Sequence, residues 1–136
     1  TRIQTPYGFI FYNCKLTREE GVTDGSVPLG RPWHPTTTFS DGRYADPYAI
    51  GSAVFMFTFM DAHIAAQGWS SMRGTSKNGG KKTQFLPETA RFFEYKNSGA
   101  GAKYNKDITP AARRQLTDFE FEHFYSKTAV LNGWLE

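Results

Sequence analysis

The most informative segment of the sequence begins at residue 30 and reads Gly30-Arg31-Pro32-Trp33-His34-Pro35-Thr36. Each proline fixes its own φ angle and disfavours the α region for the residue before it, so this segment is predicted to be extended. Alternation along an extended chain puts Arg31 and Trp33 on one face and His34 on the other. A guanidinium beside an indole suits either an anionic sugar or a catalytic carboxylate that must stay ionised. The alternative is a structural ion pair made by Arg31, with Trp33 filling the core.

Three aromatic runs flank this stretch, from Phe9 to Tyr12, from Phe55 to Phe59 and from Phe92 to Tyr95. Aromatic residues favour strands, because they suit a pleated and half-buried surface. An Asn or Asp and then a small residue follow each run, as in Asn13-Cys14, Asp61-Ala62 and Asn97-Ser98. The pattern predicts either a stacked β-solenoid with irregular insertions or three ordinary strands of a small mixed sheet.

The 136 residues, with 39% hydrophobic and 21% charged side chains, fit a single folded unit over residues 1–136. No apolar run approaches the roughly 18 residues of a membrane span. The net charge of +3 is mild and the basic residues are scattered, which disfavours a nucleic-acid partner. Because Cys14 is the sole cysteine, an internal disulfide and a cysteine-based zinc site are excluded.

Long polar segments separate the aromatic runs, over Thr17–Leu29, His34–Ile50 and Gly68–Phe85. None has clear periodicity, and we expect loops that are functional or disordered. Near the C-terminus, Thr117 and Glu120 have the spacing of a capping box. Phe121, Phe124 and Tyr125 follow at helical spacing, so a short amphipathic helix is predicted over residues 117–125, packed on the outside of the strands.

The run from Gly30 through Trp33 to Asp46-Pro47 resembles the C-terminal half of bacterial pectin methylesterases, the carbohydrate esterases that demethylate polygalacturonate. The likeness continues through Gly68-Trp69-Ser70-Ser71-Met72 and Phe93-Glu94-Tyr95-Lys96-Asn97 to Arg113-Arg114-Gln115-Leu116. The resemblance implies an all-β fold, a right-handed parallel β-helix whose C-terminal coils carry long loop excursions and a short C-terminal helix. It also implies a secreted or cell-envelope location and no cofactor.

Five residues take roles from this resemblance. Arg31 matches the arginine that pairs with the nucleophilic aspartate and orients it, and Trp33 matches the aromatic that stacks on the galacturonosyl ring. Thr36 matches a further cleft residue, and Met72, with Trp69 nearby, matches a substrate-contacting position. The implied partner is methylated polygalacturonate, the polymer of pectin.

The resemblance also implies what the chain lacks. The aspartate nucleophile, the aspartate that acts as general acid and then base, and the glutamines of the oxyanion site belong to coils N-terminal to the Arg-Pro-Trp motif. Only 29 residues precede Gly30, and none forms the Gln-Asp or Asp-Phe-Ile-Phe-Gly elements. We therefore expect this chain alone to be inactive. Two alternatives stay open: a non-catalytic module that binds acidic polysaccharide, and a related ester or thioester hydrolase.

The other ionisable residues have ordinary explanations. Asp41 and Asp46 are typical of turns, and together they are only a weak candidate for an acid–base pair. Glu94 lies inside an apolar strand, where we expect it to pair with an arginine such as Arg43 or Arg114. No metal site is predicted, because the three histidines lack ligand spacing; they are His34, His63 and His123.

Overall fold

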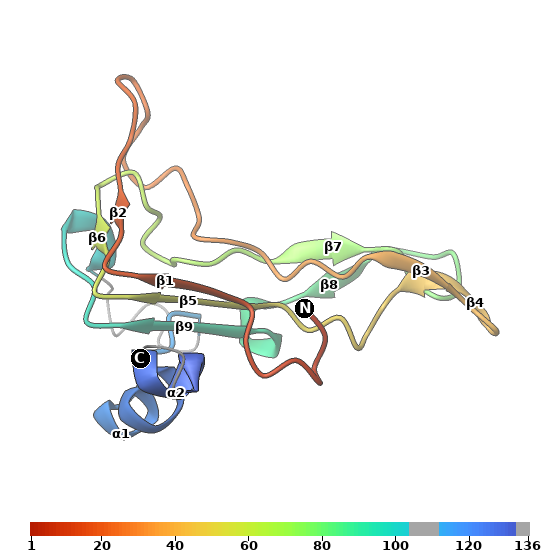
Figure 1. Cartoon of the computed structure of the whole chain (residues 1–136). Coiled ribbons are helices and arrows are strands. Elements are labelled where there is room, and N and C mark those ends of the chain that lie inside the picture. The colour runs from red at the N-terminus through yellow and green to blue at the C-terminus, as the bar shows by residue number, and fades with distance from the viewer. Residues whose placement is uncertain (104–111, 133–136) are drawn as a thin grey trace.

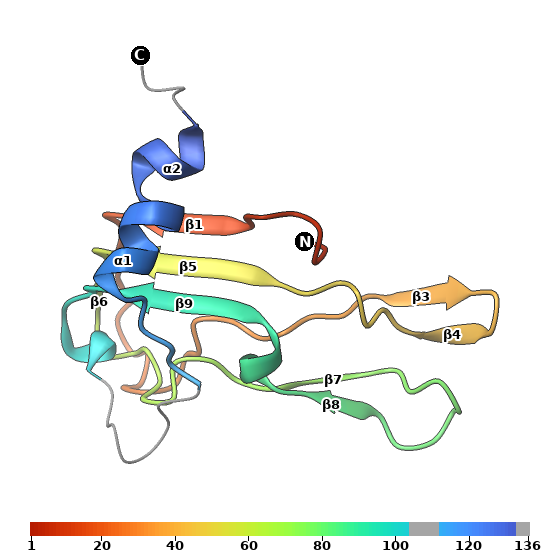
Figure 2. The same ribbon diagram turned by 90° about the horizontal axis from the view of Figure 1, so that it is seen from below.

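A three-stranded parallel sheet lies at the centre of the chain (Figures 1 and 2). The structure is a computed structural model that describes residues 1–103 and 112–132. The strand order is β1 (Phe9–Tyr12), β5 (Ser52–Met56) and β9 (Arg91–Tyr95). The three predicted aromatic runs therefore pair with one another, and the described chain is mostly strand with a short helical segment, as predicted.

A sharp corner follows each of these strands. Asn13, Phe57 and Lys96 occupy successive equivalent positions and have positive φ angles of 53°, 49° and 45°. Backbone hydrogen bonds hold the corners together: Asn13 N donates to the Met56 carbonyl at 3.0 Å, and Phe57 N to the Tyr95 carbonyl at 2.9 Å. The expectation that an Asn or Asp ends a strand is confirmed at Asn13, which forms the first corner, and at Asp61, which directly follows Met60 and opens a turn in which Ile64 N donates to the Asp61 carbonyl at 3.2 Å. At the other two corners the stacked pairing imposes a positive φ on Phe57 and Lys96, which rarely adopt it.

A second parallel pairing comes after the corner. It joins β2 (Lys15–Leu16) to β6 (Phe59–Met60), and Phe59 then pairs with Ser98. The predicted strand from Phe55 to Phe59 is therefore divided between β5 and β6. A third parallel pairing consists of two isolated bridges, Val27 to Ile64 and Gly30 to Trp69. The same parts of the chain are therefore joined by three sets of parallel pairing: the β1–β5–β9 sheet, the β2–β6 pair and the two isolated bridges.

Two antiparallel hairpins interrupt these pairings. One joins β3 (Thr36–Phe39) to β4 (Gly42–Ala45), and the other joins β7 (Met72–Gly74) to β8 (Thr83–Phe85). Both views show them side by side at one end of the molecule (Figures 1 and 2). Thr75 ties them together, because its carbonyl accepts from Ala45 N at 3.0 Å and its Oγ1 lies 3.0 Å from that of Thr36. The prediction of loops without regular structure was therefore wrong for two of the three polar segments.

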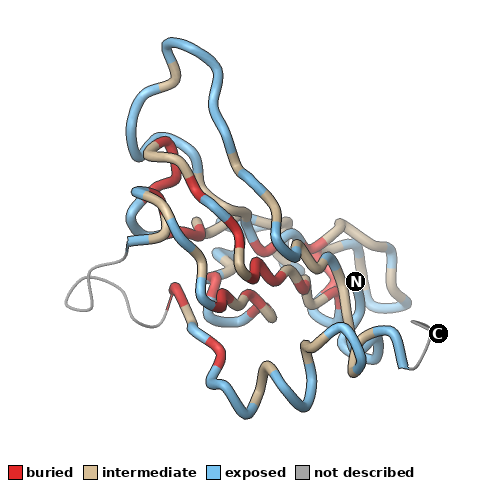
Figure 3. Tube along the Cα trace, turned by 60° about the vertical axis from the view of Figure 1, so that its left-hand side comes forward, coloured by how far each residue is buried: buried red, intermediate tan, exposed pale blue. Residues whose placement is uncertain are grey.

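One hydrophobic core lies against one face of the central sheet, and the buried segments gather in the middle of the molecule (Figure 3). Aromatic stacking holds it together. The ring centroids of Phe11 and Phe55 are 4.4 Å apart, and those of Trp69 and Phe92 are 4.2 Å apart. These contacts join β1, β5 and β9 to the segment around Trp69, which lies beneath Gly30. The buried residues of this core are Phe55, Met60, Ile64, Trp69, Ala90 and Phe92.

The C-terminal helical segment covers the other face of the sheet (Figure 2). It consists of three short elements: the helix α1 (Asp118–Glu120), the π-turn η3 (Phe121–Tyr125) and the helix α2 (Lys127–Leu131). The predicted capping box is confirmed, because Glu120 N donates to Thr117 Oγ1 at 3.1 Å and Thr117 N to Glu120 Oε2 at 2.7 Å. Phe121 stacks on Tyr95 with centroids 4.5 Å apart. Phe124, in contrast, is 52% exposed, because the π-turn changes the helical spacing.

Two 3₁₀ turns complete the regular structure of the described residues, η1 (Pro87–Thr89) and η2 (Ala100–Ala102). None of the helices in residues 1–103 and 112–132 is long and apolar enough to cross a membrane.

Candidate functional site

The third parallel pairing positions the start of the Gly30–Thr36 segment. Leu29 N donates to the Gly68 carbonyl at 2.6 Å, and Ser70 N donates to the Gly30 carbonyl at 3.1 Å. The backbone of Gly30 lies directly on the indole of Trp69, and a Cβ at this position would meet the ring at 3.1 Å. Since Trp69 is only 2% exposed and stacked on Phe92, the segment rests on a rigid part of the core.

Beyond Gly30 the side chains alternate as the two prolines predict. Pro32 and His34 are buried, whereas Arg31 and Trp33 are exposed, and Trp33 is 63% exposed. The His34 Nδ1 atom lies 2.7 Å from the Asp46 carbonyl oxygen, and its ring stacks on Phe85 with centroids 3.8 Å apart. The buried side of the segment is therefore anchored, and the indole of Trp33 is free to meet a ligand.

Arg31 and Trp33 border a common cavity of about 310 Å³. Most of its lining residues are apolar, and β1 contributes Phe9 and Phe11 to the wall while β5 contributes Phe55. Phe9 is 72% exposed, so the cavity opens at the outer edge of the sheet. The arrangement puts one cation and one exposed indole at the rim of an apolar hollow, which suits a ring with an apolar face and a nearby carboxylate.

The other three predicted site residues lie in different settings. Trp69 forms a wall of the cavity beneath Gly30, but its stacking face is covered by Phe92, so its position fits support of the segment better than contact with a sugar. Thr36 opens β3 and its hydroxyl contacts Thr75. Met72 opens β7 opposite Phe85. Both are partly buried, and neither borders the cavity of Arg31.

Glu94 makes a buried ion pair, but with a partner that the sequence did not indicate. Its carboxylate oxygens accept from Arg113, from Nε at 2.9 Å and from an Nη atom at 2.5 Å, and both side chains are almost fully buried. The expected partners, Arg43 and Arg114, were wrong. Arg114 points away, where it donates to the Ala90 carbonyl and lies 4.6 Å from the Phe93 ring centre. Desolvation lowers the pKa of Arg114.

Asp41 and Asp46 do not form an acid–base pair. Asp46 is 1% exposed and accepts from Arg2 and from Tyr48 N, both at 2.9 Å. Asp41 lies at the tip of the β3–β4 hairpin, where it contacts Lys77 and Tyr44. Among residues 1–103 and 112–132, no group of three or more His, Cys, Asp and Glu side chains could hold a metal ion.

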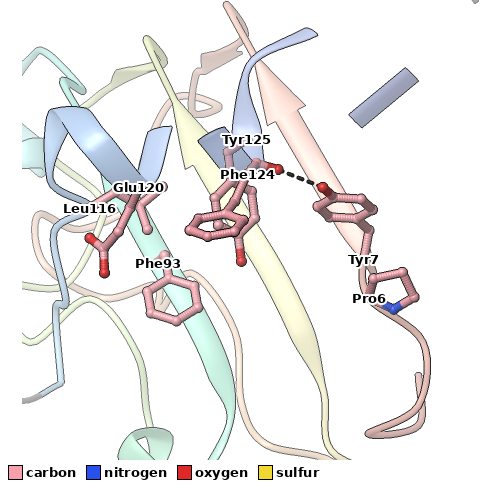
Figure 4. Close-up of a pocket in the computed structure, with 7 residues that line it drawn as sticks. All are labelled: Pro6, Tyr7, Phe93, Leu116, Glu120, Phe124 and Tyr125. Atoms are coloured by element: carbon pink, nitrogen blue, oxygen red, sulfur yellow. Dashed lines mark hydrogen bonds between the residues drawn. The ribbon is translucent and has the colours of Figure 1, made fainter. Parts of the chain in front are cut away.

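A second hollow lies between the N-terminal segment and the C-terminal helical segment, on the other side of the sheet (Figure 4). The Tyr7 hydroxyl donates to the Phe124 carbonyl at 2.6 Å across it. Its lining is aromatic and aliphatic apart from Glu120, and none of the lining residues within the described part of the chain is a cation. The Arg31–Trp33 cavity is therefore the better candidate for an acidic ligand.

Curated pectinesterases match nearly the whole chain. Pectinesterase A of Dickeya chrysanthemi is 52% identical over 135 residues, which is 98% of this chain and 34% of that protein. The chain is a homologue of the bacterial pectin methylesterases. It spans about a third of the length of the curated bacterial relatives that it matches. No protein-family model matches the chain.

Solved structures of pectin methylesterases superpose on this chain. The enzyme from Yersinia enterocolitica superposes with a TM-score of 0.88 at 47% identity, covering 100% of this chain and 40% of that one. A pectin methylesterase mutant in complex with a hexasaccharide gives a TM-score of 0.86 at 51% identity, covering 98% and 37%. The resemblance to bacterial pectin methylesterases that the sequence indicated is confirmed.

Proposed function

We propose that this chain is the C-terminal part of a pectin methylesterase and forms the last coils of a right-handed parallel β-helix. Two observations support the coil. Phe9 pairs with Ala53 and Lys15 pairs with Phe59, and both pairs have the same separation along the chain, so β1 and β2 stack as a unit on β5 and β6. The hairpins explain why the aromatic runs are unevenly spaced, because they are insertions between coils.

The outer edge of β1 is where the N-terminal coils would stack. Within the described residues β1 pairs on one side only, with β5, and leaves Phe9 exposed. An unpaired edge with an exposed aromatic is a template for another strand. A preceding coil on this edge would cover the open side of the Arg31–Trp33 cavity and bring new side chains to its rim.

The proposed chemistry needs two aspartates from those coils. One carboxylate attacks the carbonyl carbon of the methyl ester, and the oxyanion collapses to an acyl-enzyme as methanol leaves with a proton from the second aspartate. A water molecule, deprotonated by the second aspartate, then hydrolyses the acyl-enzyme. Arg31 orients the first carboxylate and keeps it ionised, while Trp33 stacks on the galacturonosyl ring; Thr36 and Met72 contact the polymer further along.

The Gly30–Thr36 segment gives this proposal its strongest support. The buried side of the segment is anchored, and its other face presents the Arg31 guanidinium and Trp33, which is 63% exposed. The substrate is methylated polygalacturonate, and the protein acts outside the cytoplasm or in the cell envelope. Similarity to a pectin methylesterase solved with a hexasaccharide supports the sugar polymer as ligand.

The test measures methanol release from methyl-esterified pectin by the 136-residue chain and by the longer protein that carries it. We expect turnover by the longer protein and none by the chain alone, and Arg31→Lys in the longer protein should reduce kcat. Robust turnover by the isolated chain would contradict the proposal.

A binding module for acidic polysaccharide is the second candidate, since Trp33 is exposed whatever the chemistry nearby. Polymer binding that depends on Trp33, without any methanol release by the longer protein, would favour it. Release of a different alcohol or a thiol would favour the related ester or thioester hydrolase.

A further inference from the structure

Arg31 and Trp33 each lie beside a separate anchor of their extended segment. Arg31 directly follows Gly30, whose backbone lies on a buried indole. Trp33 directly precedes His34, whose ring is buried. Pro32 separates the two side chains, and it is fully buried with a φ angle fixed by its ring. The two exposed side chains are therefore supported from opposite ends of the segment.

The first anchor is a rigid contact between Gly30 and Trp69. A Cβ at Gly30 would meet two atoms of the six-membered ring of the indole, at 3.1 and 3.3 Å, which is closer than ordinary van der Waals contact. The indole has no room to retreat, because it is 2% exposed and stacks on Phe92 with an angle of 13° between the ring planes. The hydrogen bond from Ser70 N to the Gly30 carbonyl keeps the two in contact. A side chain at residue 30 would therefore lift the backbone that carries Arg31.

The second anchor lies at the base of the two hairpins. His34 Nδ1 lies 2.7 Å from the carbonyl oxygen of Asp46, which directly follows β4. The His34 ring stacks on Phe85, the last residue of β8, with centroids 3.8 Å apart. Trp69, in contrast, belongs to the core against the central sheet. The two anchors thus belong to different parts of the fold, and a substitution in one leaves the contacts of the other in place.

We propose that the first anchor serves the chemical step and the second serves binding. Gly30 and Trp69 are positioning residues for Arg31, and Phe85 is a positioning residue for Trp33. The proposal rests on the proposed function, in which Arg31 orients the attacking carboxylate and Trp33 stacks on the sugar. A misplacement of about 1 Å costs up to about 10²-fold in rate, so the first anchor governs kcat. Stacking on Trp33 forms with the bound substrate and persists in the transition state, so the second anchor governs KM.

The test measures kcat and KM of the full-length protein with methyl-esterified hexagalacturonate. Gly30→Ala should lower kcat about tenfold and change KM by less than about twofold. Phe85→Leu removes the ring that stacks on His34 but keeps an apolar side chain, so it should raise KM about three- to tenfold and change kcat by less than about twofold. Gly80→Ala is the matched control for Gly30→Ala, because none of the described atoms lies within 4 Å of a Cβ there, and it should change neither constant.

A rescue experiment distinguishes positioning from a general loss of stability. Trp69→Phe replaces the indole by a smaller ring, which leaves room for a Cβ at residue 30. Trp69→Phe alone should lower kcat about threefold, because the support of Gly30 becomes less rigid. Gly30→Ala should then cost less than about threefold in kcat in the Trp69→Phe protein, against about tenfold in the wild-type protein. Two substitutions that merely destabilised the fold would add their losses instead.

The outcomes separate this proposal from the proposed function. If Gly30→Ala raises KM as much as it lowers kcat, or costs the same with Trp69→Phe as without it, the first anchor is wrong. If Phe85→Leu lowers kcat as much as Gly30→Ala does, the segment moves as one body and the separation of anchors is wrong. In either case the proposed function stands when Arg31→Lys still lowers kcat. If the wild-type full-length protein releases no methanol, the proposed function and the two anchors fail together.

Discussion

The buried pair of Glu94 and Arg113 offers a quantitative test of how the segment around Arg113 is held against β9. The exposed fractions of the two side chains are 2% and 0%. Arg113 also donates to the Gly101 carbonyl at 3.0 Å and to the Ala66 carbonyl at 3.4 Å, so it joins three parts of the chain. Glu94→Ala would leave the guanidinium buried without its counter-charge.

Breaking one side of a buried pair costs about 3–5 kcal/mol, because the remaining charge stays desolvated. We expect Glu94→Ala to lower the free energy of unfolding by about that amount, which is a large share of the 5–15 kcal/mol typical of a folded protein. Urea unfolding followed by circular dichroism measures it. Glu122→Ala is the control, since Glu122 is exposed and its loss should change the free energy by less than about 0.5 kcal/mol.

The double variant Glu94→Leu with Arg113→Met separates the charge from the packing. Replacing both partners by apolar residues removes the unpaired charge, so the double variant should be more stable than Glu94→Ala. A loss below about 1 kcal/mol for Glu94→Ala would contradict this expectation, because it would mean that Arg113 becomes hydrated or pairs with another carboxylate.

Three further predictions concern the turn at Gly68 and the helical segment. Gly68→Ala should destabilise the protein by about 1–3 kcal/mol more than Gly79→Ala in urea unfolding. Both glycines have a positive φ, but a Cβ at Gly68 would meet Arg113 at 2.8 Å, whereas none of the described atoms lies within 4 Å of a Cβ at Gly79. Equal losses for the two variants would contradict this packing. Thr117→Ala should cost about 1 kcal/mol in the same assay, because it removes the capping box, and no loss would mean that the helix start is held otherwise. Hydrogen bonds from Tyr95 and then Lys96 lower the pKa of Asp118, so Tyr95→Phe should raise this pKa in an NMR titration, and an unchanged value would contradict the contact.

The local features of the site followed from short-range rules. Two prolines predict the extended Gly30–Thr36 segment, and alternation then correctly separates Arg31 and Trp33 from His34. The spacing of Thr117 and Glu120 likewise predicts a cap that the structure contains. Each of these rules depends on residues within a few positions of one another, so the sequence suffices.

The features that the sequence missed depend on contacts between distant segments. Phe57 has a left-handed backbone, against its own preference, because the corners on both sides of it are hydrogen-bonded in a stack. The β3–β4 hairpin has short strands, and both of them contact Thr75 of the second hairpin, which lies about 30 residues further along the chain. Lys77 reaches Asp41 from another hairpin, and no spacing in the sequence indicates that contact.

Trp33 is the proposed platform for a sugar ring, and the affinity of the full-length protein for oligogalacturonate measures its contribution. Phe119→Ala is the matched control, because Phe119 is 62% exposed and lies on the C-terminal helical segment, away from the cavity. Loss of base stacking on an aromatic costs about 1–3 kcal/mol, and we expect a similar cost for a sugar ring, so Trp33→Ala should weaken binding about fivefold or more while Phe119→Ala leaves it unchanged. Equal affinities of the wild-type protein and Trp33→Ala for oligogalacturonate would mean that Trp33 is not a platform for the sugar.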